Sequence, residues 1–260
     1  MCIRDSKKAE FGVGIARMED RYFQTNIIDF SETKHDKSTY SIFGGSIVLE
    51  GSTLNARQFA TQGSREKMAA QIFTGTEHFR SGASKVTKDT PEPYKKVQSW
   101  LQVSYQNETY HKVSPKFTLG AYLEAYYSSR NFSNNYTATL MQAGEFTPTA
   151  HSKVTYNEAF RANQYAGVGA MPIYQLSESF QLRGEFYGFV PIFPIKKDEY
   201  GQAYYGKAFT KFEYLGEISL VFQLSFGSIS AYVNHYSSPS NDWNVGLTLG
   251  WQLFNSRFIE

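Results

Sequence analysis

The sequence has almost no cysteine, no long hydrophobic run and no excess of one charge. Cys2 is its single cysteine, so no disulfide can form within the chain. It contains no stretch of about 18 consecutive apolar residues, which excludes a transmembrane helix. Lys and Arg number 26 against 24 Asp and Glu, and this balance gives no electrostatic reason to expect nucleic acid as a partner.

The motifs of common catalytic and metal sites are also missing. A Gly-x-Ser-x-Gly nucleophile turn does not occur, and the stretch Gly201–Lys207, which has the Gly-x-x-x-x-Gly-Lys spacing, is followed by Ala208 instead of the Ser or Thr that completes a phosphate loop. The histidines are scattered, without an i, i+4 pair or a cysteine cluster, so we expect no metal site and no cofactor. They are His35, His78, His111, His151 and His235. We interpret His235, which lies in an alternating stretch, as an interface residue rather than a ligand.

Aromatic residues are abundant for a chain that is polar on average. There are 19 Tyr and 21 Phe among 260 residues, while the mean hydropathy is −0.43. This length suits one large domain or two small ones. Many aromatics in a hydrophilic chain are typical of a membrane barrel, which has a wet interior and an apolar outer face with aromatic girdles.

The first six residues differ from the rest of the chain. Residues 1–6, "MCIRDS", resemble the translation of a sequencing adapter. We interpret them as an artefact and residues 7–260 as the protein's own sequence. The lack of a signal peptide then says nothing about localisation.

Apolar and polar residues alternate along many stretches, as in "DWNVGLTLGWQLF" (242–254). A side-chain period of two predicts strands with one apolar and one polar face. The predicted strands are 9–23, 39–54, 64–75, 98–113, 117–130, 165–176, 180–193, 211–225, 227–238 and 243–255. These exceed the usual 5–6 residues of soluble strands and suit the roughly 9–11 residues of a tilted membrane strand.

The connections between the predicted strands alternate between short and long. Residues 113–116, 177–179 and 226–228 form tight turns, with 239–243 a further short connection. The long connections are 76–97, 131–164 and 194–210. Short turns at one end and long loops at the other are typical of outer-membrane barrels.

Charged residues recur on the polar faces of the predicted strands. Arg183, Glu185, Glu217 and Glu124 would be costly in the dry core of a soluble sandwich, but not in a wet lumen. We therefore predict an all-β fold, an antiparallel transmembrane β-barrel, with apolar faces toward lipid. Trp243 and Trp251 are expected near the two membrane interfaces.

Two motifs resemble the BamA-type, or bacterial surface antigen, superfamily of outer-membrane proteins. "FATQGSREKMAA" (59–70) resembles its Phe-x-Thr-x-Gly-x-Arg turn, in which glycine permits a tight bend. "FRANQYAGVGAMP" (160–172) ends the longest loop and precedes five predicted strands. In that superfamily such a loop folds into the barrel, and its arginine meets an acidic residue of the wall. The resemblance implies a structural ion pair between Arg161 and Glu185, whereas the plainer alternative leaves Arg161 a solvated loop residue.

The C-terminal stretch 213–260 resembles the barrel module fused to patatin-like phospholipases. This resemblance implies an incomplete barrel, about the last ten of sixteen strands, that anchors a lipid acyl hydrolase domain absent from this chain, with translocation of that domain as a further candidate role. It implies an outer-membrane location, membrane lipid as partner with lipopolysaccharide and the barrel-assembly machinery as further candidates, and a monomeric full-length protein. No catalytic residue is assigned here, so whether the parent protein is an enzyme stays open.

Three alternatives remain at this point. The first is a BamA-like assembly or secretion barrel without a hydrolase, which the upstream sequence would distinguish. The second is a porin-type channel, against which an inward loop argues because it would fill the lumen. The third treats Glu124, Glu185 and Glu217 as an acid–base set, although lumen polarity and hydrogen bonding explain them more simply.

Overall fold

A computed structural model describes residues 6–23, 35–56, 58–82, 94–224, 227–238 and 243–251. Ten strands form one antiparallel sheet in the order β1-β2-β3-β4-β5-β8-β9-β12-β13-β14. Their bounds are β1 Ser6–Tyr22, β2 Asp36–Ser52, β3 Gly63–Arg80, β4 Tyr94–Lys112, β5 Phe117–Ser128, β8 Gln164–Gln175, β9 Phe180–Pro191, β12 Glu213–Leu224, β13 Gly227–Tyr236 and β14 Trp243–Trp251. The predicted all-β antiparallel class is confirmed.

Smaller elements interrupt the long connections. Between β5 and β8 lie the helix α1 and two single-turn helices, together with a two-stranded ladder of β6 and β7, and β10 pairs with β11 between β9 and β12. Their bounds are α1 Tyr136–Gln142, β6 Gly144–Glu145, η1 Ser152–Val154, η2 Glu158–Phe160, β7 Arg161–Ala162, β10 Ile195–Lys197 and β11 Ala203–Tyr205. Nothing in the alternating pattern predicted these elements. Of the helices in the described ranges, none has the length and apolarity needed to span a lipid bilayer.

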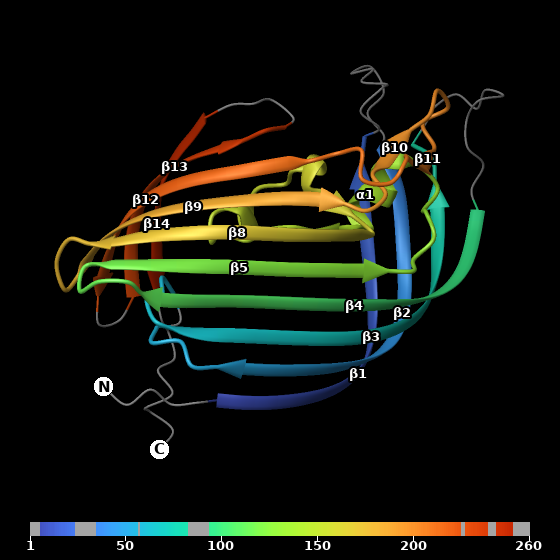
Figure 1. The fold of residues 1–260 in the computed structure, drawn as a ribbon. Helices are drawn as coiled ribbons and strands as arrows, with labels where there is room; N and C mark the ends of the chain where they lie inside the picture. Colours follow the sequence, from blue (N-terminus) through green and yellow to red (C-terminus); the bar gives the residue numbers. More distant parts are fainter. Residues whose placement is uncertain are drawn as a thin grey trace.

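The sheet curves strongly, and α1 lies on its concave side (Figure 1). The turns β4–β5 and β8–β9 lie at one end of the strands, while α1 and the β10–β11 hairpin lie at the other. The predicted alternation of short and long connections is thus present. β1 and β14 are the two ends of the strand order, and within the described residues they are not paired with each other.

The two faces of the sheet differ as the alternation predicts. On β12, Glu217 and Ser219 point into the concave side and are buried, while Ile218 and Leu220 on the convex side are 49% and 43% exposed. The same alternation holds on β9, where Arg183 is buried and Leu182 exposed. Charged and polar side chains therefore share the inside with buried apolar ones such as Phe189 and Leu215, whereas apolar side chains cover the outside of these strands.

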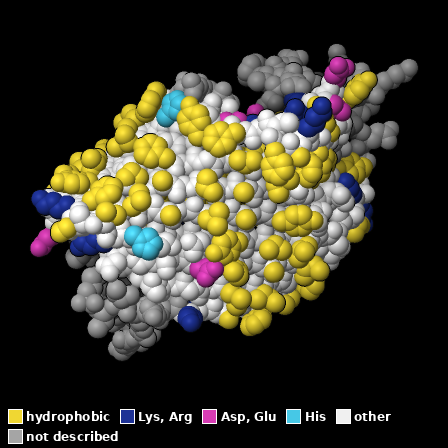
Figure 2. All heavy atoms as spheres, viewed as in Figure 1, with side chains coloured by type: hydrophobic (Ala, Val, Ile, Leu, Met, Phe, Trp, Pro, Cys, Tyr) yellow, Lys and Arg dark blue, Asp and Glu magenta, His cyan; other side chains and the backbone are white. Residues whose placement is uncertain are grey.

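Charge is absent from a large part of the convex face. In the described lengths of β5, β8, β9, β12, β13 and β14, this face holds no Asp, Glu, Lys or Arg. Figure 2 shows hydrophobic side chains spread over the middle of the molecule, with charged side chains mainly toward its ends. An exposed apolar surface of this extent is unusual for a soluble monomer.

Candidate functional site

The connection from 129 to 163, here called the inward loop, fills the concave side of the sheet. Its helix α1 begins after Asn135, whose side chain accepts a hydrogen bond from the Ala138 amide at 2.9 Å. The same side chain donates to the Tyr22 hydroxyl of β1 at 2.9 Å, and Gln142 at the end of α1 donates to Asp20 of β1 at 2.7 Å. The inward loop thus reaches the first strand of the sheet.

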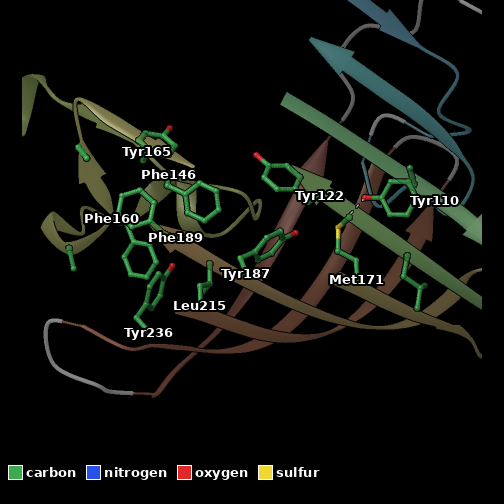
Figure 3. Packing of buried hydrophobic residues seen from close by; sticks show 14 residues of the cluster. Tyr110, Tyr122, Phe146, Phe160, Tyr165, Met171, Tyr187, Phe189, Leu215 and Tyr236 are labelled. Carbon is green, nitrogen blue, oxygen red and sulfur yellow. Dashed lines mark hydrogen bonds between the residues drawn. The ribbon is translucent and has the colours of Figure 1, made fainter. Parts of the chain in front are cut away.

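Aromatic rings attach the middle of the inward loop to the wall (Figure 3). Phe146 is buried, with its ring centroid 5.5 Å from that of Phe189 and 6.0 Å from that of Tyr165. A Cβ atom placed on Gly167 would lie 2.1 Å from the Phe146 ring, so this ring can approach the strand only where a side chain is missing. Apolar packing therefore fixes the loop over β8 and β9.

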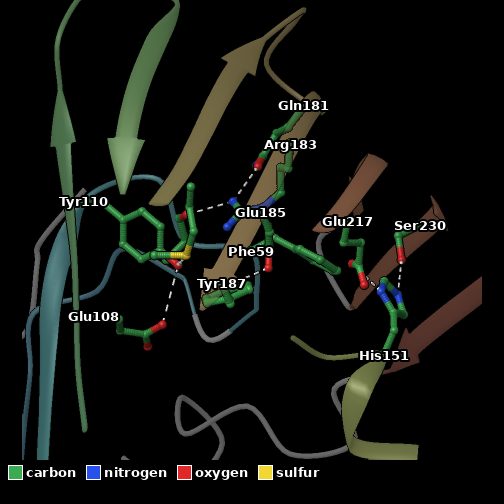
Figure 4. Close-up of polar contacts among 12 residues, drawn as sticks. Phe59, Glu108, Tyr110, His151, Gln181, Arg183, Glu185, Tyr187, Glu217 and Ser230 are labelled. Carbon is green, nitrogen blue, oxygen red and sulfur yellow. Dashed lines mark hydrogen bonds and ion pairs between the residues drawn. The ribbon is translucent and has the colours of Figure 1, made fainter. Parts of the chain in front are cut away.

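His151 attaches the loop to the far side of the sheet (Figure 4). Its Nδ1 lies 2.6 Å from Glu217 Oε1 of β12, and its Nε2 lies 3.3 Å from Ser230 Oγ of β13. Its ring stacks on that of Tyr232 with centroids 3.6 Å apart. A serine, a histidine and a carboxylate in this order resemble a hydrolase triad. However, all three residues are at most 3% exposed, so no substrate can reach them, and the contacts serve to hold the loop.

Arg161 and Glu185 do not form the predicted ion pair with each other. Arg161 Nη2 lies 2.7 Å from Glu145 Oε2, across the β6–β7 ladder within the same loop, and its Nη1 donates to the carbonyl of Leu140 at 3.2 Å. The prediction of a wall partner was therefore wrong. Residues 144–145 and 161–162 pair with each other inside the loop, and this pairing brings the Glu145 carboxylate within reach of the guanidinium.

Glu185 pairs instead with Arg183, two residues away on the same face of β9. Their Nε and Oε1 atoms lie 3.2 Å apart, and the Tyr187 hydroxyl donates to Oε2 of Glu185 at 2.9 Å. The i, i+2 spacing of the two charges on one strand face could have indicated this pair from the sequence. Both partners are buried, so the pair is shielded from bulk solvent.

Arg183 also holds the connection between β2 and β3, which contains the "FATQG" motif. Its Nη1 donates to the Ala60 carbonyl at 2.9 Å, and Gln223 of β12 donates to the Phe59 carbonyl at 3.2 Å. Gly63 has φ +93°, and a Cβ there would lie 2.2 Å from the Thr53 carbonyl oxygen. The glycine of the motif is thus required by a tight bend.

A third group of contacts lies beneath α1. The Arg130 guanidinium stacks 4.6 Å from the Trp100 ring and donates to Gln142 at 2.8 Å. Burial lowers the pKa of Arg130, and it raises the pKa of Tyr136 on α1 to about 12. The Arg130 guanidinium also lies 5.2 Å from the Tyr40 ring of β2, so this residue connects the loop with strands β2 and β4.

The three carboxylates that could have formed an acid–base set are engaged separately. Glu124 accepts hydrogen bonds from the hydroxyls of Tyr122 and Tyr165, the latter at 2.7 Å. Glu185 is bound by Arg183, and Glu217 by His151. Each thus serves a contact within the interior. Among the described residues, no group of three or more His, Cys, Asp and Glu is arranged to hold a metal ion.

The predicted interface residue Trp243 lies on the convex face and is 69% exposed. Its ring centroid is 4.8 Å from that of His235, and both residues line an apolar groove of about 670 Å³ that crosses β8, β9, β12, β13 and β14. The side chain of Trp251 lies outside the described residues, as do residues 1–5 of the suspected adapter segment. The location of Trp243 at a membrane interface stays a prediction.

Comparison with known proteins adds no assignment to this geometry. Neither the models of known protein families nor the sequences of curated proteins match the chain. Sequence reasoning missed His151 and Phe146, because a side chain in an irregular loop carries no periodic signal that would place it against the wall.

Proposed function

We propose that this sheet is part of the wall of an outer-membrane β-barrel that anchors its protein in lipid. The observation that supports this proposal best is the uncharged convex face of the strands from β5 to β14, opposed to a concave face that carries charged side chains such as Arg183 and Glu217. A lipid-facing barrel requires this distribution. A soluble sheet would have to cover the same apolar face with another layer.

Closure of the sheet is part of the proposal. In lipid, the unpaired backbone groups of β1 and β14 would each cost several kcal/mol, because no water is present to satisfy them. We therefore propose that β1 and β14 lie within a continuous ring of strands in the membrane. The resemblance of the C-terminal strands to the barrel module of patatin-like phospholipases suggests a lipid acyl hydrolase as the anchored domain.

The inward loop favours an anchor over an open channel. It contacts β1 through Asp20, the central strands through Phe189 and the far strands through Glu217. A loop held at so many points would obstruct a lumen. A BamA-like assembly barrel remains the second candidate for the whole protein, because the Gly63 turn resembles that superfamily.

Spin labels placed singly along β12 test the proposal. Spin labels on cysteines that replace Ile218 and Leu220 should be accessible to oxygen dissolved in the lipid and inaccessible to a water-soluble nickel reagent. Cysteines replacing Ser219 and Val221 should be protected from both, because these residues are buried. Cys2 is first replaced by serine in every sample. Labels at 218 and 220 that are open to the nickel reagent would contradict a lipid-facing wall.

A further inference from the structure

The convex face of β1 to β4 carries a group of positive charges that neither the inward loop nor the apolar wall explains. Antiparallel pairing places Arg21 opposite Lys37, and Lys37 opposite Arg80, so three cations form one row across β1, β2 and β3. On the same face, Lys95 lies in the next row of paired residues, and Arg17 lies in the row after that. We call these five residues the cation zone.

The cation zone is exposed and only partly neutralised. Arg21 and Lys37 are 61% and 38% exposed, and both pair with Glu19, the one carboxylate on this part of the face in the described residues. Arg17, Arg80 and Lys95 are also solvent-exposed. Like charges directly opposite each other destabilise a sheet. The row Arg21–Lys37–Arg80 is therefore not explained by the stability of the fold.

The cation zone directly adjoins the apolar part of the same face. Along β4, Lys95 is followed on this face by Val97, and along β1 Arg17 is preceded by Ile15. Val97 and Ile15 are 66% and 85% exposed. A ligand lying along these strands would meet cations at one end and an apolar surface at the other. That combination fits an amphiphile with an anionic headgroup.

The size of the cation zone indicates more than one anionic group. Three neighbouring strands span about 10 Å, and the rows from Arg17 to Arg21 span roughly 13 Å. Hydrogen bonds from a cation to a phosphate oxygen are about 2.7–2.9 Å long, so one phosphate contacts only adjacent cations. Two phosphates on one headgroup could engage the row and its neighbours together.

We propose that the cation zone binds the headgroup of a membrane lipid that carries two phosphates, with its acyl chains along the adjoining apolar surface. This inference rests on the proposed function, because it places the lipid at the rim of a membrane-spanning wall. The long-connection end of the strands, where the zone lies, would then face the leaflet that contains this lipid. The attraction is electrostatic and should weaken as salt is added.

The test measures lipid binding to the detergent-solubilised protein with three probes: diphosphoryl lipid A, monophosphoryl lipid A and phosphatidylcholine. The variant is Arg21→Gln, Lys37→Gln and Arg80→Gln together. The matched control removes three exposed cations at the opposite end of the strands, Lys7→Gln, Lys112→Gln and Lys116→Gln. Unchanged far-ultraviolet circular dichroism establishes that both proteins remain folded.

We expect the unmodified protein and the control to bind diphosphoryl lipid most tightly, and the variant to lose at least about tenfold in that affinity. Equal affinity for the two lipid A forms would overturn the requirement for two phosphates. Equal losses in variant and control would overturn the site but leave the membrane function intact. Failure to bind any of the three lipids would instead contradict the proposed function itself.

Discussion

His151 and Glu217 are almost completely buried, and His151 Nδ1 lies 2.6 Å from Glu217 Oε1. Water therefore cannot replace either partner in this contact. His151→Ala would leave the Glu217 carboxylate without its imidazole partner in the interior. We expect a loss of about 3–5 kcal/mol in the free energy of unfolding, measured by urea titration, and faster proteolysis of the inward loop. The matched control is Lys153→Ala, an exposed position two residues further along the loop, for which we expect a change within about 0.5 kcal/mol. Similar losses in both variants would exclude a specific role for the histidine.

The partner of Arg161 can be identified by double-mutant cycles. Arg161→Ala combined with Glu145→Ala should reveal a coupling of about 0.5–1 kcal/mol, because the Glu145 side chain is 32% exposed and water screens the pair. Arg161→Ala combined with Glu185→Ala should give additive effects. Coupling with Glu185 and none with Glu145 would restore the pair expected from the family resemblance.

At the scale of elements, the inward loop and strand β8 depend on a close contact between a ring and a glycine. Gly167→Ala would place a methyl group 2.1 Å from Phe146, and the ring would have to move. We expect a destabilisation of about 1–3 kcal/mol in urea unfolding. The same substitution in a Phe146→Ala background should cost less, since the ring is gone.

The control for this contact is Gly14→Ala on β1, where an added Cβ meets no atom within 4 Å. It should have little effect or stabilise slightly, because alanine reduces the freedom of the unfolded chain. If Gly167→Ala cost the same with and without the Phe146 ring, the packing of loop on strand would not depend on this contact.

At the scale of the whole molecule, a charged side chain introduced in the middle of the convex face should destabilise the protein more than one introduced at its rim. Ile218→Arg would place a guanidinium in the central part of the apolar face and should cost about 2–4 kcal/mol of folding free energy in lipid vesicles. Thr39→Arg, on the same face of β2 near the cation zone, should cost at most about 1 kcal/mol. Equal costs at the two positions would argue against a membrane-spanning band between them.

Much of the secondary structure follows from local chemistry that the sequence displays. A period of two over "FEYLGEISLVFQL" determines that Glu217 and Ile218 point to opposite faces, because successive side chains of a strand alternate whatever surrounds them. The strand positions, the faces and the alternation of short and long connections could be predicted for this reason. The helix α1 could not, since its seven residues are too few to show a helical period.

The contacts of the inward loop were decided by the tertiary structure alone. Arg161 meets Glu145 rather than Glu185 because the inward loop folds back on itself, and no local pattern records the path of an irregular loop. His151 reaches Glu217 across 66 residues of sequence for the same reason. The sequence by itself therefore determined which side chains face inward, because alternation is a local property. Only the folded chain decided which of them touch, because contact depends on how the sheet curves and where the loop lies.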